Sequence, residues 1–320
     1  MILIVSFPNN EHVEQVQRHL TVESVVVNTA SFPVSLGLSA AVSRERECLH
    51  FALPGTPGVC LCKVGAVWYR RIRPYEFHDD LRDNTARLFA WSEANEALLG
   101  VWYSLECFWM NPPTADEVAQ RKIRQLQVAR RVGLSIPDTL VTNQPDAAKE
   151  FVGTHGIGQV IRKAFRNIPQ APRETHLLRE EDLGLLDTVR HTPVIFQRYV
   201  PADLDLRVTV VEDEIFAAAI SSEARYAADY RPGLGSAKVV PYDLPVDVQQ
   251  KLLELMRVFG LKYGAIDLRV TPDGDHVFLE VNPVGEYLFI SQRTGQAIPA
   301  AIAASLERHD RNWSQHRSPC

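Results

Sequence analysis

Residues 263–286 constrain the fold of this 320-residue chain more than any other stretch. Residues 265–270 alternate apolar and polar side chains, 271–274 read Thr-Pro-Asp-Gly, and the alternation resumes over 276–281. Two alternating runs joined by a turn that contains Pro and Gly are typical of a β-hairpin. The stretch is therefore predicted to form two antiparallel strands.

The alternation also predicts which side chains the hairpin buries, because successive side chains of a strand point to opposite faces. The apolar side chains of the first strand share one face: Ile266, Leu268 and Val270. Asp267 and Arg269 lie on the other face. On the return strand, Glu280 and Asn282 are predicted to share a face with Phe278.

Three oxygen-bearing side chains, those of Asp267, Glu280 and Asn282, can thus converge across the paired strands. Two carboxylates and an amide are poor ligands for zinc and good ones for Mg²⁺, which prefers hard oxygens and shares them with phosphates. The same pattern also fits the solvent-exposed polar face of an edge hairpin. The rest of the chain has to decide between the two.

Composition narrows the class of protein. A hydrophobic content of 46% and a charged content of 23% are ordinary for a globular chain, and the net charge of −5 gives no sign of a nucleic-acid partner. No apolar run approaches the roughly 18 residues of a spanning helix, so no membrane partner is expected. The five cysteines stand at irregular spacings, which favours cytoplasmic thiols, and Cys60 and Cys62 are interpreted as a structural thiol pair.

The pattern of elements predicts an α/β (α+β) fold in three units: 1–112, 113–192 and 193–320. In the first unit we expect strands, two of them an antiparallel pair, and two helices, over 1–7, 11–20, 24–28, 49–54, 59–63, 66–70 and 80–107. The strand-helix-strand opening predicts a small parallel sheet. The helix over 80–107 carries an aromatic stripe, which is typical of a core or of a dimer contact.

The second and third units are predicted to mix strands and helices, over 115–132, 136–143, 146–152, 159–165, 183–189, 194–200, 205–220, 246–259 and 298–306. Asn111-Pro-Pro breaks the chain before them. Thr114 is predicted to cap the helix over 115–132, with Glu117 at the capping-box spacing. Residues 167–181 and 221–238 are interpreted as loops that cover a site.

Cations come from the middle of the chain and oxygen ligands from its end. Lys122, Lys163, Arg207 and Arg231 precede Asp267. Fixed positive charge together with metal ligands is what a nucleoside triphosphate requires. The chain has no Gly-x-x-x-x-Gly-Lys-Ser/Thr run, so it is not a P-loop protein. Each cation also has a plain alternative, such as a solvated basic helix face for Lys122 or a structural ion pair for Arg207.

The order of these motifs resembles the ATP-grasp ligases over about residues 122–306. The motifs are the helix lysine, Gly133 with Pro137, the strand lysine, Gln197-Arg-Tyr-Val200, Asp205-x-Arg207 and Asp267…Glu280-x-Asn282. A narrower resemblance covers nearly the whole chain. Val67-Trp-Tyr-Arg-Arg71, Trp109-Met-Asn-Pro-Pro113, Pro137-Asp-Thr-Leu-Val-Thr-Asn143 and Asp229-Tyr-Arg231 are similar to the graspetide (microviridin-type) maturases, which macrocyclise ribosomal peptides.

The resemblance implies an ATP-grasp fold, in which a pre-ATP-grasp domain precedes two subdomains that clasp ATP. Lys122 and Lys163 would hold the phosphates. Asp205 would lie near the ribose and Arg207 near the phosphates, where Arg207 also acts in catalysis. The strand Gln197-Arg198-Tyr199-Val200 would meet adenine through its backbone, although Arg198 stands where related ligases often have Glu.

For the chemistry, the resemblance implies that Asp267, Glu280 and Asn282 bind two Mg²⁺ ions, with Glu280 bridging and Mn²⁺ able to substitute. Arg231 would stabilise the acyl phosphate, and Asp229 would serve as a general base. Asp229-Tyr-Arg departs from the common Asp-Trp-Arg.

The implied partner is a precursor peptide with a leader and a core rich in acidic and in hydroxyl or Lys residues. Its Asp or Glu carboxylates would be activated and closed into esters or amides by Ser, Thr or Lys. Two alternatives stay open: a ligase that adds an amino acid such as glutamate to a peptide terminus, and a nucleotide-binding module without catalysis.

Overall fold

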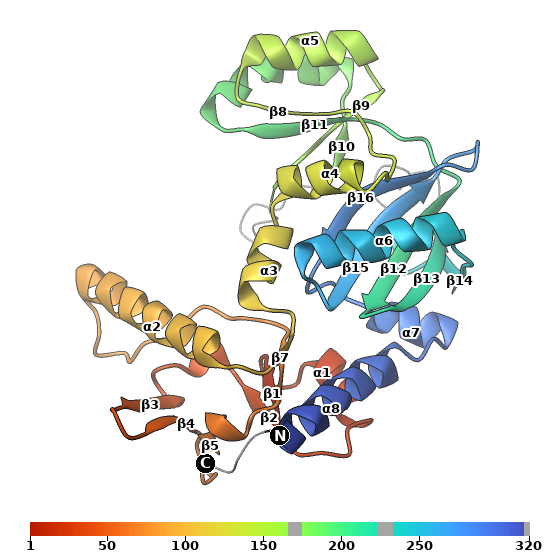
Figure 1. Cartoon of the computed structure of the whole chain (residues 1–320). Coiled ribbons are helices and arrows are strands. Elements are labelled where there is room, and N and C mark those ends of the chain that lie inside the picture. Colours follow the sequence, from red (N-terminus) through yellow and green to blue (C-terminus); the bar gives the residue numbers. More distant parts are fainter. Residues whose placement is uncertain (166–174, 223–232, 317–320) are drawn as a thin grey trace.

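The computed structural model describes residues 1–165, 175–222 and 233–316. Three sheets follow one another along the chain, and a fourth, smaller sheet of three strands lies beside the first (Figure 1). Within the described residues, no helix is both long and apolar enough to cross a membrane.

The N-terminal unit is built on a parallel sheet, as the sequence predicts. Its strands run in the order β2-β1-β6-β7, with bounds Ser24–Val27, Ile2–Val5, Ala66–Tyr69 and Phe108–Met110. Both faces are covered, since Ile2 and Ile4 belong to one core and Leu3 and Val5 to another. The remaining elements of the unit are α1 (Glu11–Gln17), η1 (Thr29–Ser31), β3 (Gly37–Val42), β4 (Glu47–Ala52), β5 (Val59–Cys60), η2 (Leu61–Lys63) and α2 (Asn84–Ser104).

The predicted antiparallel pair is present as β4 and β5, with β3 as an additional strand. The aromatic stripe of α2 is only half buried. Leu98 and Trp102 lie in the core, whereas Leu88 is 68% exposed and Trp91 is 48% exposed. The expectation that the stripe belongs to a core is therefore confirmed for the last turns of the helix, and the first turns leave the dimer contact as the other prediction.

The central unit is an antiparallel sheet in the order β10-β9-β11-β8, with bounds His176–Leu177, Val160–Lys163, Val194–Arg198 and Thr139–Thr142. The helices α5 (Pro145–His155) and η3 (Glu180–His191) supply residues to one core with β9 and β11. The short strand β10 corrects the prediction of an unbroken loop over 167–181, of which residues 167–174 lie outside the described part.

The helix predicted over 115–132 is two helices, α3 (Pro113–Ala119) and α4 (Lys122–Arg131). The predicted cap is also wrong, because Pro112 is the N-cap and no side chain caps α3. Arg121 is extended, with φ −80° and ψ 104°. The amide of Gln125 explains the break: its Nε2 donates to Val281 O at 2.8 Å and its Oε1 accepts from Val281 N at 3.1 Å, so α4 docks on the C-terminal sheet.

The C-terminal unit has a five-stranded antiparallel sheet in the order β14-β13-β12-β15-β16. The strand bounds are Lys238–Pro241, Glu214–Ser221, Leu204–Val211, Tyr263–Val270 and His276–Asn282. Helix α6 (Val246–Phe259) matches its prediction and ends at Gly260, whose φ of 70° is left-handed. Helices α7 (Leu288–Thr294) and α8 (Ile298–His316) follow, and α8 returns to the N-terminal sheet, where Ile302 and Leu306 share a core with Ile4 and Trp68 (Figure 1).

The opening hairpin is formed by β15 and β16, but one face assignment in it is wrong. Asp267 pairs with Glu280, whereas the next residue, Leu268, pairs with Phe278, because a β-bulge shifts the register between them. Phe278 is therefore buried on the core face with Leu268. The bulge keeps the apolar side chain inside and leaves Glu280 on the face of Asp267.

A stability prediction arises in α3, where the Asp116 carboxyl is buried and only its Oδ2 has a hydrogen bond, from Gln120 Nε2 at 2.7 Å. Burial raises the pKa of Asp116 from 3.8 to about 6. The unfolded carboxyl ionises first, so this group lowers stability as the pH rises from 3.8 through 6, and the loss persists above that range. Asp116→Asn should raise the free energy of unfolding at pH 8 by on the order of 1–3 kcal/mol.

Urea unfolding of Asp116→Asn and of the unsubstituted protein at about pH 4.5 and pH 8, below and above the folded-state pKa of about 6, checks this. The stabilisation should be much smaller at the lower pH, where the folded protein keeps the proton. Asp273→Asn, in the exposed turn between β15 and β16, is the control and should change little at either pH. An equal stabilisation by Asp116→Asn at both pH values would contradict the argument.

Candidate active site

The candidate site is centred on the polar face of the C-terminal sheet. Asp267 on β15 and Glu280 on β16 are direct cross-strand partners. Asn282, two residues further along β16, pairs with Ala265. All three predicted metal ligands therefore lie on one face. The bulge at the register shift makes this possible while Phe278 stays buried.

Two ion pairs cross from β12 to β15 on that same face. Arg207 donates from NH1 to Asp267 Oδ1 at 2.8 Å, and Arg269 donates from Nε to Asp205 Oδ1 at 2.9 Å. The antiparallel register sets Arg207 opposite Asp267 and Asp205 opposite Arg269. Each strand therefore contributes the cation to one pair and the carboxylate to the other. All four side chains are buried, and each pair satisfies charges that would otherwise be costly to bury.

Lys122 approaches the face from α4. Its Nζ is ion-paired with Glu280 Oε2, and both side chains are about one-fifth exposed, at 23% and 20%. The break between α3 and α4 places Lys122 at the first position of a new helix rather than inside a long one. The docking of Gln125 on Val281 holds that helix against β16.

Lys163 and Gln197 lie together on the central sheet. Lys163 Nζ donates to Gln197 Oε1 at 3.0 Å, and Gln197 Nε2 donates to Thr139 Oγ1 at 2.8 Å. These contacts link neighbouring strands β9, β11 and β8. Gln197 is fully buried, so its amide is held in one orientation by two hydrogen bonds.

The strand that was predicted to meet adenine leads from the central sheet to the C-terminal sheet. The amide of Arg198 donates to Asp138 O at 2.8 Å and the amide of Tyr199 donates to Gln159 O at 2.7 Å. The carbonyl of Val200 accepts from Arg269 NH1 at 2.9 Å. The Arg269–Asp205 pair therefore also anchors this connecting segment. The side chain of Arg198 is exposed.

Two predicted catalytic residues, Asp229 and Arg231, lie outside the described residues, as does most of the predicted loop over 221–238. The part of that loop after residue 233 leads into strand β14, which the sequence analysis did not anticipate.

The described residues contain no cluster of three His, Cys, Asp or Glu side chains that could hold a metal ion. The donor set at the face is instead two carboxylates and one amide, all hard oxygens of the kind that Mg²⁺ accepts. Both carboxylates contact cations, Asp267 with Arg207 and Glu280 with Lys122. This set of ligands fits a magnesium ion. The ion would either share the Glu280 carboxylate with Lys122 or take the place of Lys122 beside it.

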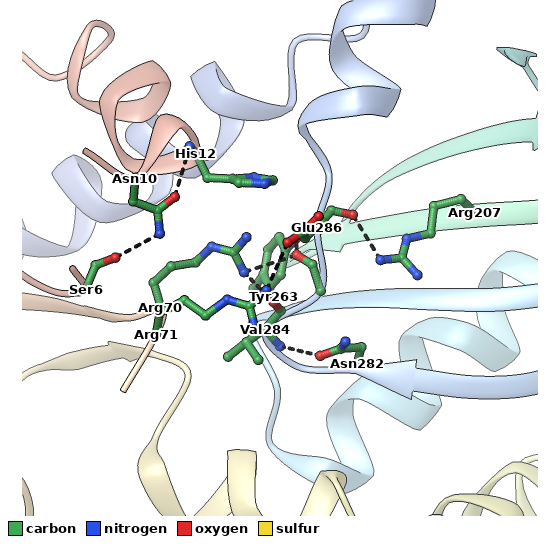
Figure 2. Close-up of polar contacts among 11 residues, drawn as sticks. Ser6, Asn10, His12, Arg70, Arg71, Arg207, Tyr263, Asn282, Val284 and Glu286 are labelled. Carbon is green, nitrogen blue, oxygen red and sulfur yellow. Dashed lines mark hydrogen bonds and ion pairs between the residues drawn. The ribbon is translucent and has the colours of Figure 1, made fainter. Parts of the chain in front are cut away.

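Sequence reasoning included the segment 283–286 in the opening stretch but did not anticipate its contacts, which hold its backbone from several sides. Asn111 Nδ2 donates to Pro283 O at 3.0 Å, Arg70 NH1 donates to Val284 O, and Tyr263 Oη donates to Gly285 O at 2.6 Å. Figure 2 shows Arg70 and Arg71 reaching this segment from the N-terminal unit. The sequence analysis named Arg70 and Arg71 only within the Val67-Trp-Tyr-Arg-Arg71 motif, which gives no sign of a partner more than 200 residues away.

Comparison with known proteins identifies the architecture. The MvdD pre-ATP grasp domain model matches residues 1–117. The fold is similar to macrocyclase MdnC bound with precursor peptide MdnA from Microcystis aeruginosa MRC, with a TM-score of 0.86 and 34% identity over 96% of this chain and 99% of that one. It is also similar to a Chryseobacterium gregarium RiPP-associated ATP-grasp ligase in complex with ADP and a leader and core peptide, with a TM-score of 0.89 and 27% identity over 96% of both chains.

A more distant sequence relative is a probable alpha-L-glutamate ligase of Pseudomonas paraeruginosa, 26% identical over 223 residues, which are 67% of this chain and 71% of that protein. All of these proteins share the ATP-grasp architecture, and the class that the fold defines is an ATP-grasp ligase, an ADP-forming enzyme. Within that class the chain belongs to the graspetide (microviridin-type) family of peptide macrocyclases.

Proposed function

We propose that this ligase activates Asp or Glu side chains of a ribosomally made precursor peptide and closes them into macrocycles with Ser, Thr or Lys side chains. The observation that carries the proposal is the convergence of Lys122 and Arg207 on Asp267 and Glu280. This occurs in a chain similar over 96% of its length to a macrocyclase bound to its precursor peptide. The precursor would have a leader and a core that carries both kinds of side chain.

The chemistry needs an activated carboxyl group, because a carboxylate has no leaving group other than oxide. Transfer of the γ-phosphoryl group of ATP to a carboxylate oxygen gives an acyl phosphate and ADP. A hydroxyl or amine of the same peptide then attacks the carbonyl carbon, loses its proton and expels phosphate, which forms an ester or an amide. The net change in the peptide is the loss of one water for each bond.

Each predicted residue has a task in this scheme. Lys122 and Lys163 bind phosphate oxygens, and Arg207 neutralises the charge that builds on the transferred phosphoryl group. The segment from Gln197 to Val200 receives adenine through its backbone. The amides of Arg198 and Tyr199 already donate to carbonyls of the protein, so other backbone groups of the segment take this role. Asp205 is assigned to the ribose side of the nucleotide, where its ion pair with Arg269 fixes it.

Asp267, Glu280 and Asn282 would hold two Mg²⁺ ions, with Mn²⁺ as a substitute, and Glu280 would bridge them. The ions would supply positive charge to the phosphate oxygens. We assign Arg231 to the acyl phosphate and Asp229 to proton removal from the attacking group. We also propose that the enzyme works in the cytoplasm, where ribosomal peptides and ATP are present, and that it is a homodimer through the exposed side chains of α2, which include Leu88 and Trp91.

The test is intact-mass measurement of a candidate precursor, such as a short peptide encoded beside this gene, after incubation with enzyme, ATP and Mg²⁺. We expect a product lighter by one water per ring, which resists trimming by peptidases. A mass gain equal to an added amino acid would instead support a glutamate-ligase-like activity, which the similarity to the Pseudomonas protein makes the second candidate. Nucleotide binding without any change in peptide mass would favour a module without catalysis.

A further inference from the structure

The segment 283–286 directly follows the proposed ligand Asn282, and its backbone carbonyls accept hydrogen bonds from Asn111, Arg70, Tyr263 and Arg207. Figure 2 shows Arg70, Tyr263 and Arg207 around the segment. Asn282 itself caps the segment, since its Oδ1 accepts from Val284 N at 3.0 Å. Asn111 binds the carbonyl of Pro283, and Arg70 NH1 contacts the carbonyls of both Val284 and Gly285, the second at 3.1 Å. The N-terminal unit therefore determines the path of a segment that belongs to the C-terminal sheet.

Arg70 is buried, with 1% of its surface exposed. Among the described residues its guanidinium has no carboxylate partner, its Nε makes no hydrogen bond, and its CZ lies 5.8 Å from the ring centre of Tyr287. The neighbouring His12 adds no second positive charge, because burial and then the charges of Arg70 and Arg71 lower its pKa to about 3 and keep the imidazole neutral. The nearby Glu286 carboxylate favours the charged guanidinium but forms its ion pair with Arg71, so the direct hydrogen bonds of Arg70 go to backbone carbonyls. A buried cation bound in this way is costly, so packing alone does not account for an arginine here.

The opposite side of the same segment contacts Arg207. Arg207 NH2 donates to Glu286 O at 2.9 Å, while its NH1 donates to Asp267. Gly285 lies between the two arginines: a Cβ at this position would stand 3.0 Å from Arg207 NH2 and 2.3 Å from Ala265 Cβ. A shift of the segment by a fraction of an ångström would therefore move the carbonyl that orients Arg207.

We propose that Arg70 is a positioning residue for the ligase reaction, which holds the carbonyls of Val284 and Gly285 so that Glu286 O orients Arg207 toward the transferred phosphoryl group. This rests on the proposed function of Arg207. A guanidinium suits the task because the two N–H groups of NH1, which contact both carbonyls, are fixed in the plane of the side chain, whereas a lysine ammonium rotates about its own bond. The N-terminal unit thereby takes part in the reaction without touching substrate.

The tests compare Arg70→Lys, which keeps the charge and removes the planar guanidinium, with the exposed control Arg44→Lys. In Arg70→Lys, hydrogen exchange of the amides over 283–287 should become faster. The kcat for ADP release should fall about 10- to 100-fold with the KM for ATP nearly unchanged, because a misplaced Arg207 weakens phosphoryl transfer more than nucleotide binding. Arg44→Lys should match the unsubstituted enzyme in both measurements.

A double-substitution cycle separates positioning from an independent effect. If Arg70 acts through Arg207, Arg70→Lys combined with Arg207→Lys should lose little more activity than Arg207→Lys alone, within about threefold. Fold losses that multiply would overturn the proposal, as would unchanged exchange over 283–287. A kcat that stays unchanged in Arg70→Lys would overturn it as well.

If Arg70→Lys shows no cooperative thermal unfolding, Tyr263→Phe replaces it, because this variant removes one hydrogen bond to Gly285 O and keeps the ring. The same two measurements then apply, with a smaller loss of kcat. If the unsubstituted protein releases no ADP with any precursor peptide, the proposed function fails. Hydrogen exchange over 283–287 still decides whether Arg70 holds the segment.

Discussion

Replacing Glu280 by Gln should lower peptide-dependent ADP release by on the order of 10³-fold, which corresponds to about 4 kcal/mol of lost transition-state stabilisation. The carboxylate is the candidate bridging ligand and is ion-paired with Lys122. A neutral amide of nearly the same shape keeps one oxygen and removes the charge that would hold two cations beside phosphate. The measurement is steady-state ADP release with ATP, Mg²⁺ and a precursor peptide.

Stability separates this loss from unfolding. The Lys122–Glu280 pair is partly exposed, so its removal should cost less than about 1 kcal/mol of unfolding free energy. The variant should also need more Mg²⁺ for half-maximal rate. Glu254→Gln, on the outer face of α6 and paired there with Arg257, is the matched control and should keep full activity. Turnover that is unaffected by Glu280→Gln would remove Glu280 from the metal site.

Strongly periodic elements of this fold were predictable from the sequence. Helix α6 and the two hairpins appear where alternation or helical spacing is clear, since each pattern buries one face on a core. The parallel opening sheet was predictable for the same reason. These predictions use only the pattern of apolar and polar residues along the chain, and each of these elements buries the apolar face that its pattern predicts.

Tertiary contacts decided what the sequence could not. The bulge that buries Phe278 changes the pairing by one residue, and the apolar run Val277-Phe278-Leu279 does not by itself indicate which side chain turns to the core. The contact between Gln125 and Val281, 156 residues apart, outweighs the propensity for one continuous helix over 115–132. The two ion pairs, Arg207–Asp267 and Asp205–Arg269, depend on the register between β12 and β15. The sequence therefore indicated Asp205 and Arg207 as site residues but not which side chains they pair with.

The Asp205–Arg269 pair gives the second large effect. Asp205→Ala and Arg269→Ala should each lower the free energy of unfolding by about 3–5 kcal/mol, because each leaves the other charge buried and unpaired. Arg269 also donates to Val200 O at 2.9 Å, so its loss should loosen the connection to the central sheet as well. Urea unfolding of both variants measures the cost.

The double variant Asp205→Leu with Arg269→Met should lose much less than the sum of the two single losses, because no buried charge remains. Asp247→Ala, which breaks an exposed pair with Lys251 on α6, is the control and should cost less than about 1 kcal/mol. If Asp205→Ala leaves stability unchanged and weakens only ATP binding, the carboxylate serves the ribose rather than the sheet. If both stability and ATP affinity fall in the single variant and only stability recovers in the double variant, the pair both supports the sheet and presents Asp205 to the nucleotide.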